Sequence, residues 1–324
     1  MARFETAGSE SSIPVGISAC VLGEKVRFDG GHKQNRFVTD ELAKYVRFRP
    51  VCPEMAIGLP VPRPTIRLVL KENEARLVDS KQGEQDFTDQ MQAFAEKHVS
   101  GLDDLCGFVV CAKSPTCGME RVKLYIPNGN TVPGGTTGVF TQKLMAAMPW
   151  LPVEEDGRLQ DPVLRENFVF RIYALHDFYQ SVGQHRSLDA FIKFHSRYKF
   201  VLMAHCPTAY KTMGQLVAGV KNWELNAFFI EYRQQFMDAL RQRANRRNNT
   251  NVLMHLQGYF KRSLTSRQKQ ELHDLIQSYR LGHQPILVPL ALIKHYLKEY
   301  PDPYLQLQTF LNPYPEELKL RYGL

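Results

Sequence analysis

The chain has 324 residues, is 44% hydrophobic and 23% charged, and carries a formal net charge of +8. This composition is ordinary for a soluble globular protein of one or two domains. No apolar run approaches the roughly 20 residues that a membrane-spanning helix needs, which excludes an integral membrane protein. The polar segment Met1–Ser12 contains no hydrophobic signal region, so we expect a cytoplasmic protein.

The first half of the chain predicts strands that alternate with helices. Strands are expected at Ile13–Ala19, Val46–Val51, Ile66–Leu70, Ala75–Val78, Cys106–Cys111 and Val122–Ile126. Helices are expected at Thr39–Tyr45, at Phe87–Val99, and from Gly134–Gly138 to about Met148. This order predicts an α/β three-layer domain with a mostly parallel sheet over residues 1–150. Residues 151–160, which contain proline, glycine and acidic residues, are interpreted as a linker.

From Asp161 onward only helical patterns appear. Eight helices are expected, at Pro162–Gln180, Ser187–Cys206, Ala209–Val220, Asn222–Arg243, Val252–Phe260, Thr265–Leu281, Pro289–Glu299 and Pro303–Leu311. Residues 161–324 hold 22 of the 41 basic residues but only 13 of the 33 acidic ones, so the positive excess lies here. The sequence therefore predicts an all-helical bundle domain with the charge of a polyanion-binding protein.

Three of the six cysteines end predicted strands of the first half. Cys20, Cys52 and Cys117 each lie beside Gly or Pro, and the carboxyl ends of parallel strands meet at one edge of a sheet. Three thiolates that converge there can hold a metal or an iron–sulfur cluster and leave one coordination position open for catalysis. A disulfide framework is not expected in a long cytoplasmic chain. On spacing alone, buried structural thiols are an equally good interpretation.

The segment Lys113–Gly118 is expected to form a tight turn after the third buried strand. Pro115 fixes its own φ and removes a backbone donor, and Gly118 is expected to take a conformation closed to other residues. Such a turn presents the hydroxyl of Ser114 and the thiol of Cys117 on the same side.

Six short motifs follow one another along the first half: Ser-Ala-Cys20-Val-Leu-Gly, Arg27-Phe-Asp29-Gly-Gly-His32-Lys33, Val51-Cys52-Pro-Glu54, Leu59-Pro-Val-Pro-Arg63, Lys113-Ser114-Pro-Thr-Cys117-Gly118 and Gly134-Gly-Thr-Thr-Gly138. This series resembles the thiouracil desulfidase family over essentially the whole first domain. The resemblance implies a 4Fe–4S cluster held by Cys20, Cys52 and Cys117, whose fourth iron has no protein ligand and binds the thiocarbonyl sulfur of the substrate. It also implies a hydrolytic, non-redox reaction in which water supplies the oxygen.

The family's acid–base pair corresponds to Glu54 and Ser114. An iron that withdraws electrons from the C=S bond makes the ring carbon open to attack by water, which a nearby carboxylate can deprotonate. The hydroxyl can orient the base or relay a proton. Without the resemblance, Glu54 is more readily interpreted as a loop carboxylate that caps backbone donors.

Several other residues of these motifs are weaker candidates for binding the phosphate or ribose of a substrate: Asp29, His32, Lys33, Arg63, Lys113, Gly135 and Thr136. The last two belong to a Gly-rich helix start, which can cradle a phosphate. The alternatives are loop-surface charge for the basic residues, an Asx-turn for Asp29 and a simple turn for the glycines.

Two further cysteines lie in the third buried strand. Cys106 and Cys111 are five residues apart, and side chains of a strand alternate between its faces, so the two thiols face opposite sides. Neither is a predicted ligand. Cys111 nevertheless lies just before the Lys113–Gly118 turn and can approach the cluster.

The second half resembles the YbgA-type domain through the motifs Leu202-Met-Ala-His205, His255-Leu-Gln-Gly-Tyr-Phe-Lys261, Gln284-Pro-Ile-Leu-Val-Pro289 and Pro301-Asp-Pro-Tyr304. The same two-domain order is similar to bacterial tRNA 4-thiouridine desulfidases, in which the helical domain is taken to grip RNA. Basic residues interleave with the rings of Tyr198, Tyr210, Tyr232, Tyr259 and Tyr279, as suits RNA.

The candidate RNA contacts are Arg197, Lys199, Arg246, Arg247, Lys261 and Arg262, of which Arg246 and Arg247 are expected between two helices. Ordinary solvated charge is the alternative for each of them. His195 lies on the same helix face as Lys199 and is more readily interpreted as a core or helix-end residue.

The leading hypothesis is therefore an iron–sulfur enzyme that converts 4-thiouridine in tRNA to uridine. A second hypothesis keeps the chemistry and replaces the substrate by a free thiouracil base or a thionucleotide. A third, of another class, is a non-catalytic RNA-binding protein with a structural metal site.

Overall fold

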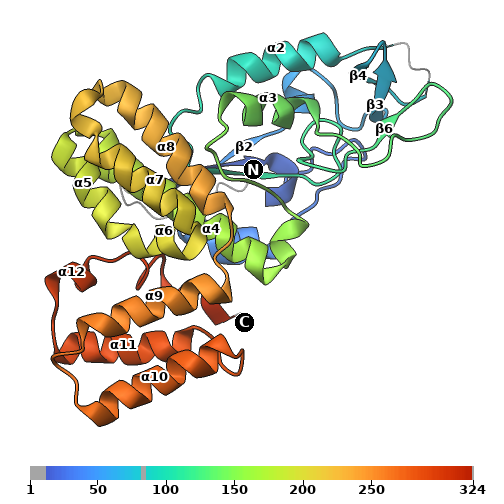
Figure 1. Ribbon diagram of the computed structural model, residues 1–324. Coiled ribbons are helices and arrows are strands. Elements are labelled where there is room, and N and C mark those ends of the chain that lie inside the picture. The colour runs from blue at the N-terminus through green and yellow to red at the C-terminus, as the bar shows by residue number, and fades with distance from the viewer. Residues whose placement is uncertain (1–11, 82–84, 323–324) are drawn as a thin grey trace. The chain divides into compact units, whose positions relative to one another are not determined.

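The computed structural model describes residues 12–81 and 85–322 (Figure 1). The chain divides into two compact units, one that ends at Leu164 and one that begins at Arg165. Of the polar segment Met1–Ser12, only Ser12 lies within the described residues. No helix of the described ranges is both long and apolar enough to cross a membrane.

The first unit is built on a parallel sheet with the strand order β2-β1-β5-β7. The strands are β1 (Ile13–Ser18), β2 (Val46–Val51), β5 (Gly107–Val110) and β7 (Val153–Glu155). Every residue of β5 is buried, as expected for an inner strand of a parallel sheet that is covered on both faces. The expected α/β domain with a mostly parallel sheet is confirmed.

The register brings the carboxyl ends of the four strands to one level. The paired residues near these ends are Ser18 with Val51, Ile17 with Val109, and Val110 with Glu155. The residues that directly follow the strands therefore share one edge of the sheet.

The interpretation of residues 151–160 as a linker was wrong, because this segment contains β7. Val153, Glu154 and Glu155 pair with β5 along its whole carboxyl half. The acidic residues that indicated a solvated linker are buried, and their carboxylates have hydrogen-bond partners, as buried charges require. The boundary between the units falls instead in the first turn of α4 (Pro162–Phe178).

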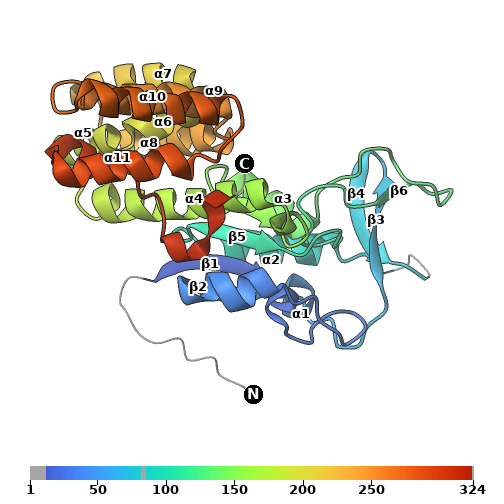
Figure 2. The same ribbon diagram turned by 90° about the horizontal axis from the view of Figure 1, so that it is seen from below.

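A second, three-stranded sheet completes the first unit. Its strands are β3 (Ile66–Lys71), β4 (Glu74–Asp79) and β6 (Leu124–Tyr125), in the order β4-β3-β6 (Figure 2). The hairpin of β3 and β4 was predicted, and β6 pairs with β3 in parallel.

The α-helices that lie wholly within the first unit are α1 (Pro53–Ala56), α2 (Thr88–Val99) and α3 (Val139–Ala147). Two short irregular helices, at Phe37–Glu41 and Leu42–Lys44, occupy the position of the helix expected at Thr39–Tyr45. Helices α2 and α3 lie side by side (Figure 1). The ring of Phe140 in α3 contacts Phe108 of β5 and Phe94 of α2. This contact fixes the start of α3 against the sheet.

The second unit is all helical, as expected. Its helices are α4 (Pro162–Phe178), α5 (Leu188–Arg197), α6 (Lys199–His205), α7 (Pro207–Ala218), α8 (Leu225–Arg241), α9 (Arg246–Tyr259), α10 (Ser266–Arg280), α11 (Leu287–Glu299) and α12 (Pro303–Gln306). Its core is aromatic, with Phe178, Phe194, Tyr232 and Phe236 in mutual ring contact.

Two boundaries in this unit differ from the expectation. The single helix expected at Ser187–Cys206 is broken at Tyr198 into α5 and α6. Helix α9 begins six residues earlier than expected, because the side chain of Asn245 caps it by accepting a hydrogen bond from Asn248 N. Arg246 and Arg247 therefore lie in its first turn and not in a loop.

Candidate functional site

A cavity of about 340 Å³ lies at the carboxyl edge of the parallel sheet. Its volume is within the usual range of small-molecule sites, about 300 to 1,000 Å³. The three predicted ligands Cys20, Cys52 and Cys117 all line it, and Cys111 joins them. Cys111 lines the cavity and Cys106 does not, as the predicted alternation of side chains along the strand requires. The Cys106 thiol donates to Asp104 O at 3.7 Å.

The other predicted residues divide between the cavity and its surroundings. The cavity is lined by Lys33, Glu54, Arg63, Lys113 and Ser114, and not by Asp29, His32, Gly135 or Thr136. Asp29 is exposed and accepts a hydrogen bond from Gly31 N at 2.9 Å, which is the Asx-turn alternative. The exposed His32 accepts from Gln34 N at 3.3 Å.

The Lys113–Gly118 turn is organised by the hydroxyl of Ser114. Ser114 Oγ accepts hydrogen bonds from Thr116 N at 3.3 Å and Cys117 N at 3.1 Å. The left-handed residue of the turn is Lys113, with a φ of 63°, and Gly118 does not have a positive φ, contrary to expectation. A glycine is needed at 118 for a different reason, because a Cβ there would lie 2.4 Å from Val122 Cγ2 and 2.9 Å from Ser114 O.

The start of α3 holds this turn from the other side. Val139 N donates to Pro115 O at 3.2 Å and Phe140 N donates to Thr116 O at 3.0 Å. The Gly134–Gly138 segment was expected to cradle a phosphate, but its amides also have backbone partners, since Thr136 N donates to Val122 O at 2.8 Å and Gly138 N donates to Gly118 O at 2.8 Å. Thr136 forms a bridge with Val122 outside the cavity, and Gly135 packs against the backbone of Arg121.

The contact between α3 and the turn predicts a specific effect of Gly138→Ala. A Cβ at position 138 would lie 2.5 Å from the carbonyl carbon of Thr116, and a backbone atom cannot move aside as a side chain does. We expect a loss of about 1–3 kcal/mol in the free energy of unfolding, measured by urea titration. Gly101→Ala is the matched control, since its Cβ would contact only His98 O at 3.7 Å. Equal effects of the two substitutions would contradict the described packing.

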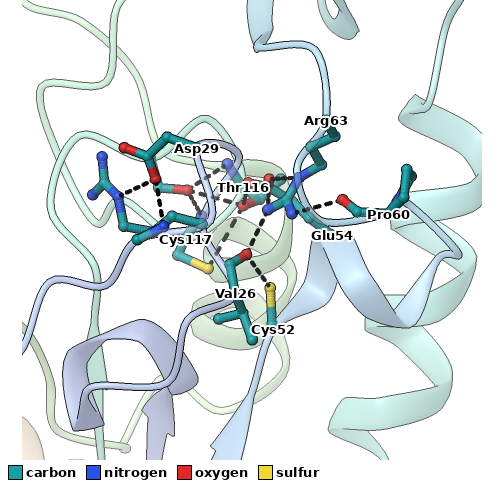
Figure 3. Close-up of polar contacts among 11 residues, drawn as sticks. Val26, Asp29, Cys52, Glu54, Pro60, Arg63, Thr116 and Cys117 are labelled. Atoms are coloured by element: carbon teal, nitrogen blue, oxygen red, sulfur yellow. Dashed lines mark hydrogen bonds and ion pairs between the residues drawn. The ribbon is translucent and has the colours of Figure 1, made fainter.

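Glu54 lies at the centre of the polar contacts in the cavity (Figure 3). Its Oε2 accepts from Arg63 Nε at 2.8 Å and Nη2 at 2.5 Å, and its Oε1 accepts from Thr116 Oγ1 at 2.9 Å. Arg63 also donates to Pro60 O and Val26 O, and its side chain is only 3% exposed. Arg63 is therefore occupied in orienting Glu54 and is not free to bind a phosphate.

Thr116 links the two predicted catalytic residues, and the sequence interpretation did not identify it. Its single hydroxyl proton goes to Glu54 Oε1, so the contact of 2.9 Å between Ser114 Oγ and Thr116 Oγ1 has Ser114 as the donor. Ser114, Thr116 and Glu54 thus form a continuous hydroxyl chain that ends in a carboxylate. Thr116 Oγ1 also lies 3.6 Å from Cys117 Sγ, so the chain runs beside a predicted ligand.

Three of the four thiols of the cavity resist ionisation, whereas the hydrogen bond with Cys20 lowers the pKa of the fourth, Cys111. A hydrogen bond with Cys111, together with burial, raises the pKa of the Cys20 thiol. Burial raises the pKa of Cys117 to about 12 and also raises the pKa of Cys52. A cation that neutralises several thiolates at once would favour deprotonation of Cys20, Cys52 and Cys117. Such a set of soft donors fits an iron–sulfur cluster.

Within residues 12–81 and 85–322, no group of three His, Cys, Asp or Glu side chains is arranged to hold a single metal ion. Each thiolate of a cluster site binds a different iron, so the soft donors that line this one cavity suit a cluster. The residues present therefore fit a polynuclear group.

A second candidate surface is an open groove of about 510 Å³ in the helical unit. It is lined by His195, Ser196, Lys199, Tyr210, Lys211, Gly214, Gln215, Ala218 and Tyr304. Within the described part of the chain, neither lysine forms an ion pair with a carboxylate. The ring of Tyr304 stacks on the exposed Tyr259 at 5.8 Å. His195 donates or accepts at Tyr232 OH, and burial lowers its pKa to about 4, so it is neutral at pH 7.

The remaining RNA candidates have different environments. Arg197 is bound to Asp177 at 2.7 Å and to Ser181 at 2.8 Å, so its guanidinium is largely committed to the bundle. Arg246, Arg247, Lys261 and Arg262 are exposed at the two ends of α9. Of the interleaved rings, Tyr198, Tyr232 and Tyr279 are buried, which leaves Tyr210 and Tyr259 accessible.

The fold and the site define a class: an α/β domain that gathers thiols and a carboxylate–hydroxyl chain at one sheet edge, joined to a basic helical domain. The model of the family described as 2-thiouracil desulfurase matches residues 15–156, and that of a protein family of unknown function, DUF1722, matches residues 199–315. An uncharacterized protein YbgA of Escherichia coli (strain K12) is 40% identical over 159 residues, which are 49% of this chain and 94% of that protein. The chain belongs to the YbgA family and carries a 2-thiouracil desulfurase domain before its helical domain.

Among solved structures, the chain is similar to one described as a [4Fe-4S]-dependent thiouracil desulfidase TudS. The sequence identity is 25%, the match covers 46% of this chain and 95% of that chain, and the TM-score is 0.36.

Proposed function

We propose that this protein removes sulfur from 4-thiouridine in tRNA by hydrolysis and leaves uridine. The observation that carries the proposal is that Cys20, Cys52, Cys117, Glu54 and Ser114 all line one cavity. In the net reaction, the C=S bond of the base and one water become a C=O bond and hydrogen sulfide, with no change of oxidation state. The match to the 2-thiouracil desulfurase family supports the desulfuration itself.

Cys20, Cys52 and Cys117 would hold a 4Fe–4S cluster, which supplies a Lewis-acidic iron with an affinity for sulfur. Glu54 takes the proton of the attacking water, because its carboxylate is fixed toward the cavity by Arg63 and Thr116. Ser114 and Thr116 form the path along which a proton passes between Glu54 and the substrate. The backbone amides bound to Ser114 Oγ hold this hydroxyl in the orientation that the transfer needs.

The choice of tRNA as substrate rests on the helical unit. Its excess of basic residues attracts a polyanion. The groove beside Tyr304 offers two ammonium groups that have no acidic partner among the described residues, and a pair of stacked rings. These are the groups that bind RNA phosphates and unstacked bases. A free thiouracil base needs neither.

If the helical unit binds tRNA and the first unit carries out the reaction, a double substitution in the groove, Lys199→Ala with Lys211→Ala, is expected to affect only the tRNA substrate. We expect 4-thiouridine loss from bulk tRNA to fall about tenfold or more at 150 mM salt, while sulfide release from free 2-thiouracil stays at the wild-type rate. The control is Lys193→Ala, since Lys193 lies in the same unit but is paired with Asp189 at 2.7 Å.

The experiment on the wild-type protein decides among the three functions. Anaerobically reconstituted full-length protein is given thiolated tRNA, 4-thiouridine monophosphate or 2-thiouracil, and sulfide is measured. Turnover of tRNA, with or without turnover of the small substrates, supports the proposal. Turnover of the small substrates without turnover of tRNA supports the second hypothesis, and salt-dependent RNA binding without sulfide release supports a non-catalytic protein.

A further inference from the structure

Three consecutive acidic residues lie buried at the carboxyl end of β7. Glu154, Glu155 and Asp156 are only 7%, 6% and 5% exposed. Buried carboxylates are costly unless they are paired or hydrogen-bonded. The hydrogen-bond partners of these three carboxylates therefore show which parts of the chain the segment holds in place.

Asp156 binds the entrance of the Lys113–Gly118 turn. Its Oδ1 accepts from Ala112 N at 2.7 Å, directly before the turn, and its carboxylate pairs with Lys33 Nζ at 3.0 Å. Its backbone carbonyl accepts from Asn35 Nδ2 at 2.8 Å. One residue thus joins the sheet edge to the start of the turn and to the loop that carries Lys33 into the cavity.

Glu155 binds the exit of the same turn. Its Oε1 accepts from Met119 N at 2.9 Å and from Glu120 N at 3.3 Å, directly after Gly118. Glu154 has a different role, because its Oε1 accepts from Arg158 Nε at 2.6 Å and from Glu155 N. Among the described residues, Glu154 therefore bonds directly only within its own segment, and its partner Arg158 in turn donates to the side chain of Glu120 at 2.8 Å and not to a backbone amide of the turn.

We propose that Glu155 and Asp156 are positioning residues that clamp the Cys117 turn at both ends and so fix Cys117 and Ser114 against the cavity. The role of the clamp in catalysis rests on the proposed function, because Cys117 and Ser114 are residues of the proposed reaction. The hydrogen bonds of the clamp are present in the protein without a cluster. A strand paired along β5 is a rigid base for such a clamp, and ligands of a metal group need this support to keep their orientation.

The clamp is tested first without any cluster, by hydrogen exchange of single amides in the full-length protein. In Glu155→Ala the amides of Met119 and Glu120 are expected to exchange about tenfold faster, with Ala112 unchanged. In Asp156→Ala the pattern reverses. Glu155→Gln keeps an oxygen acceptor and is expected to restore protection.

The second measurement is the rate at which a reconstituted cluster loses iron to a chelator. Glu155→Ala and Asp156→Ala are expected to lose iron about tenfold faster than wild type, because ligand support of this kind typically contributes 10–100-fold in metal affinity. Glu154→Ala is the matched control: it removes an equally buried carboxylate, and is expected to lower the melting temperature without changing the iron-loss rate. Should Glu155→Ala not fold, Glu155→Asp is used, since it keeps the charge but is too short to reach both amides.

The outcomes separate the clamp from the function. Wild-type exchange at the three amides in both alanine variants, or iron loss in Glu154→Ala as fast as in Glu155→Ala, would overturn the clamp. A different result would support the clamp and refute the proposed reaction. In it, the alanine variants show the expected faster exchange, while the wild-type protein binds a cluster but releases no sulfide.

Discussion

Cys117→Ala is expected to abolish sulfide release and to leave less than the full complement of cluster iron after anaerobic reconstitution. A 4Fe–4S cluster with two thiolates has two irons without protein ligands and is lost readily. Iron and acid-labile sulfide per chain, together with the visible absorption of the cluster, measure the binding step. Sulfide released from thiolated tRNA measures the reaction. Retention of full activity by Cys117→Ala would show that the ligand assignment is wrong.

Two other cysteines of the same unit serve as controls, one outside the cavity and one that lines it. Cys106→Ala removes a buried thiol whose sulfur bonds to Asp104 O and which does not line the cavity, so iron content and activity are expected to stay at the wild-type level. Cys111→Ala removes the thiol that lies against Cys20. Three ligands suffice in our assignment, so Cys111→Ala is expected to keep its iron. Loss of iron in Cys111→Ala with retention in Cys117→Ala would exchange the two roles.

The strands that carry this site could be predicted because their residues are apolar or alternate between apolar and polar, and because each strand ends at a Gly- or Pro-containing turn. Val46–Val51 was predicted at its observed bounds, and the parallel pairing of β1 with β2 places Cys20 and Cys52 at one edge of the sheet. Cys117 lies seven residues beyond β5 and reaches the same cavity through the Lys113–Gly118 turn. Strand β7 escaped prediction because it is three residues long and two of them are acidic. Its burial depends on backbone amides that belong to residues 119 and 120, more than thirty positions earlier.

The connections inside the site could not be read from residue types. Arg63 resembled a free cation, and only the fold of its proline-rich loop brings it back onto Glu54. Thr116 was an ordinary turn residue in the sequence, and its role depends on a hydroxyl proton that points at one carboxylate oxygen. In the helical unit, Tyr232 and Tyr259 both lie close to basic residues in the sequence, yet the ring of Tyr232 is in the core and that of Tyr259 is 40% exposed.

Glu54→Gln is expected to lower the rate of desulfuration by about a hundredfold to ten-thousandfold, with the iron content unchanged. The amide fills the same space beside Arg63 and Thr116 but cannot take a proton from water. Single-turnover sulfide release by the reconstituted variant measures this step separately from cluster loading. A variant that loses its iron would instead assign Glu54 a role in holding the site together.

The hydroxyl chain also predicts that two substitutions of Thr116 lower the rate of desulfuration to different extents. Thr116→Val has nearly the shape of threonine but breaks the path between Ser114 and Glu54, whereas Thr116→Ser keeps the hydroxyl that donates to Glu54 Oε1. We expect the serine variant to retain most of the activity and the valine variant to approach the rate of Glu54→Gln. If Ser114 passed its proton directly to the substrate without Glu54, the valine variant would be nearly as active as wild type. The ratio of the valine and serine rates at equal iron content therefore measures how much of the proton transfer passes through Thr116.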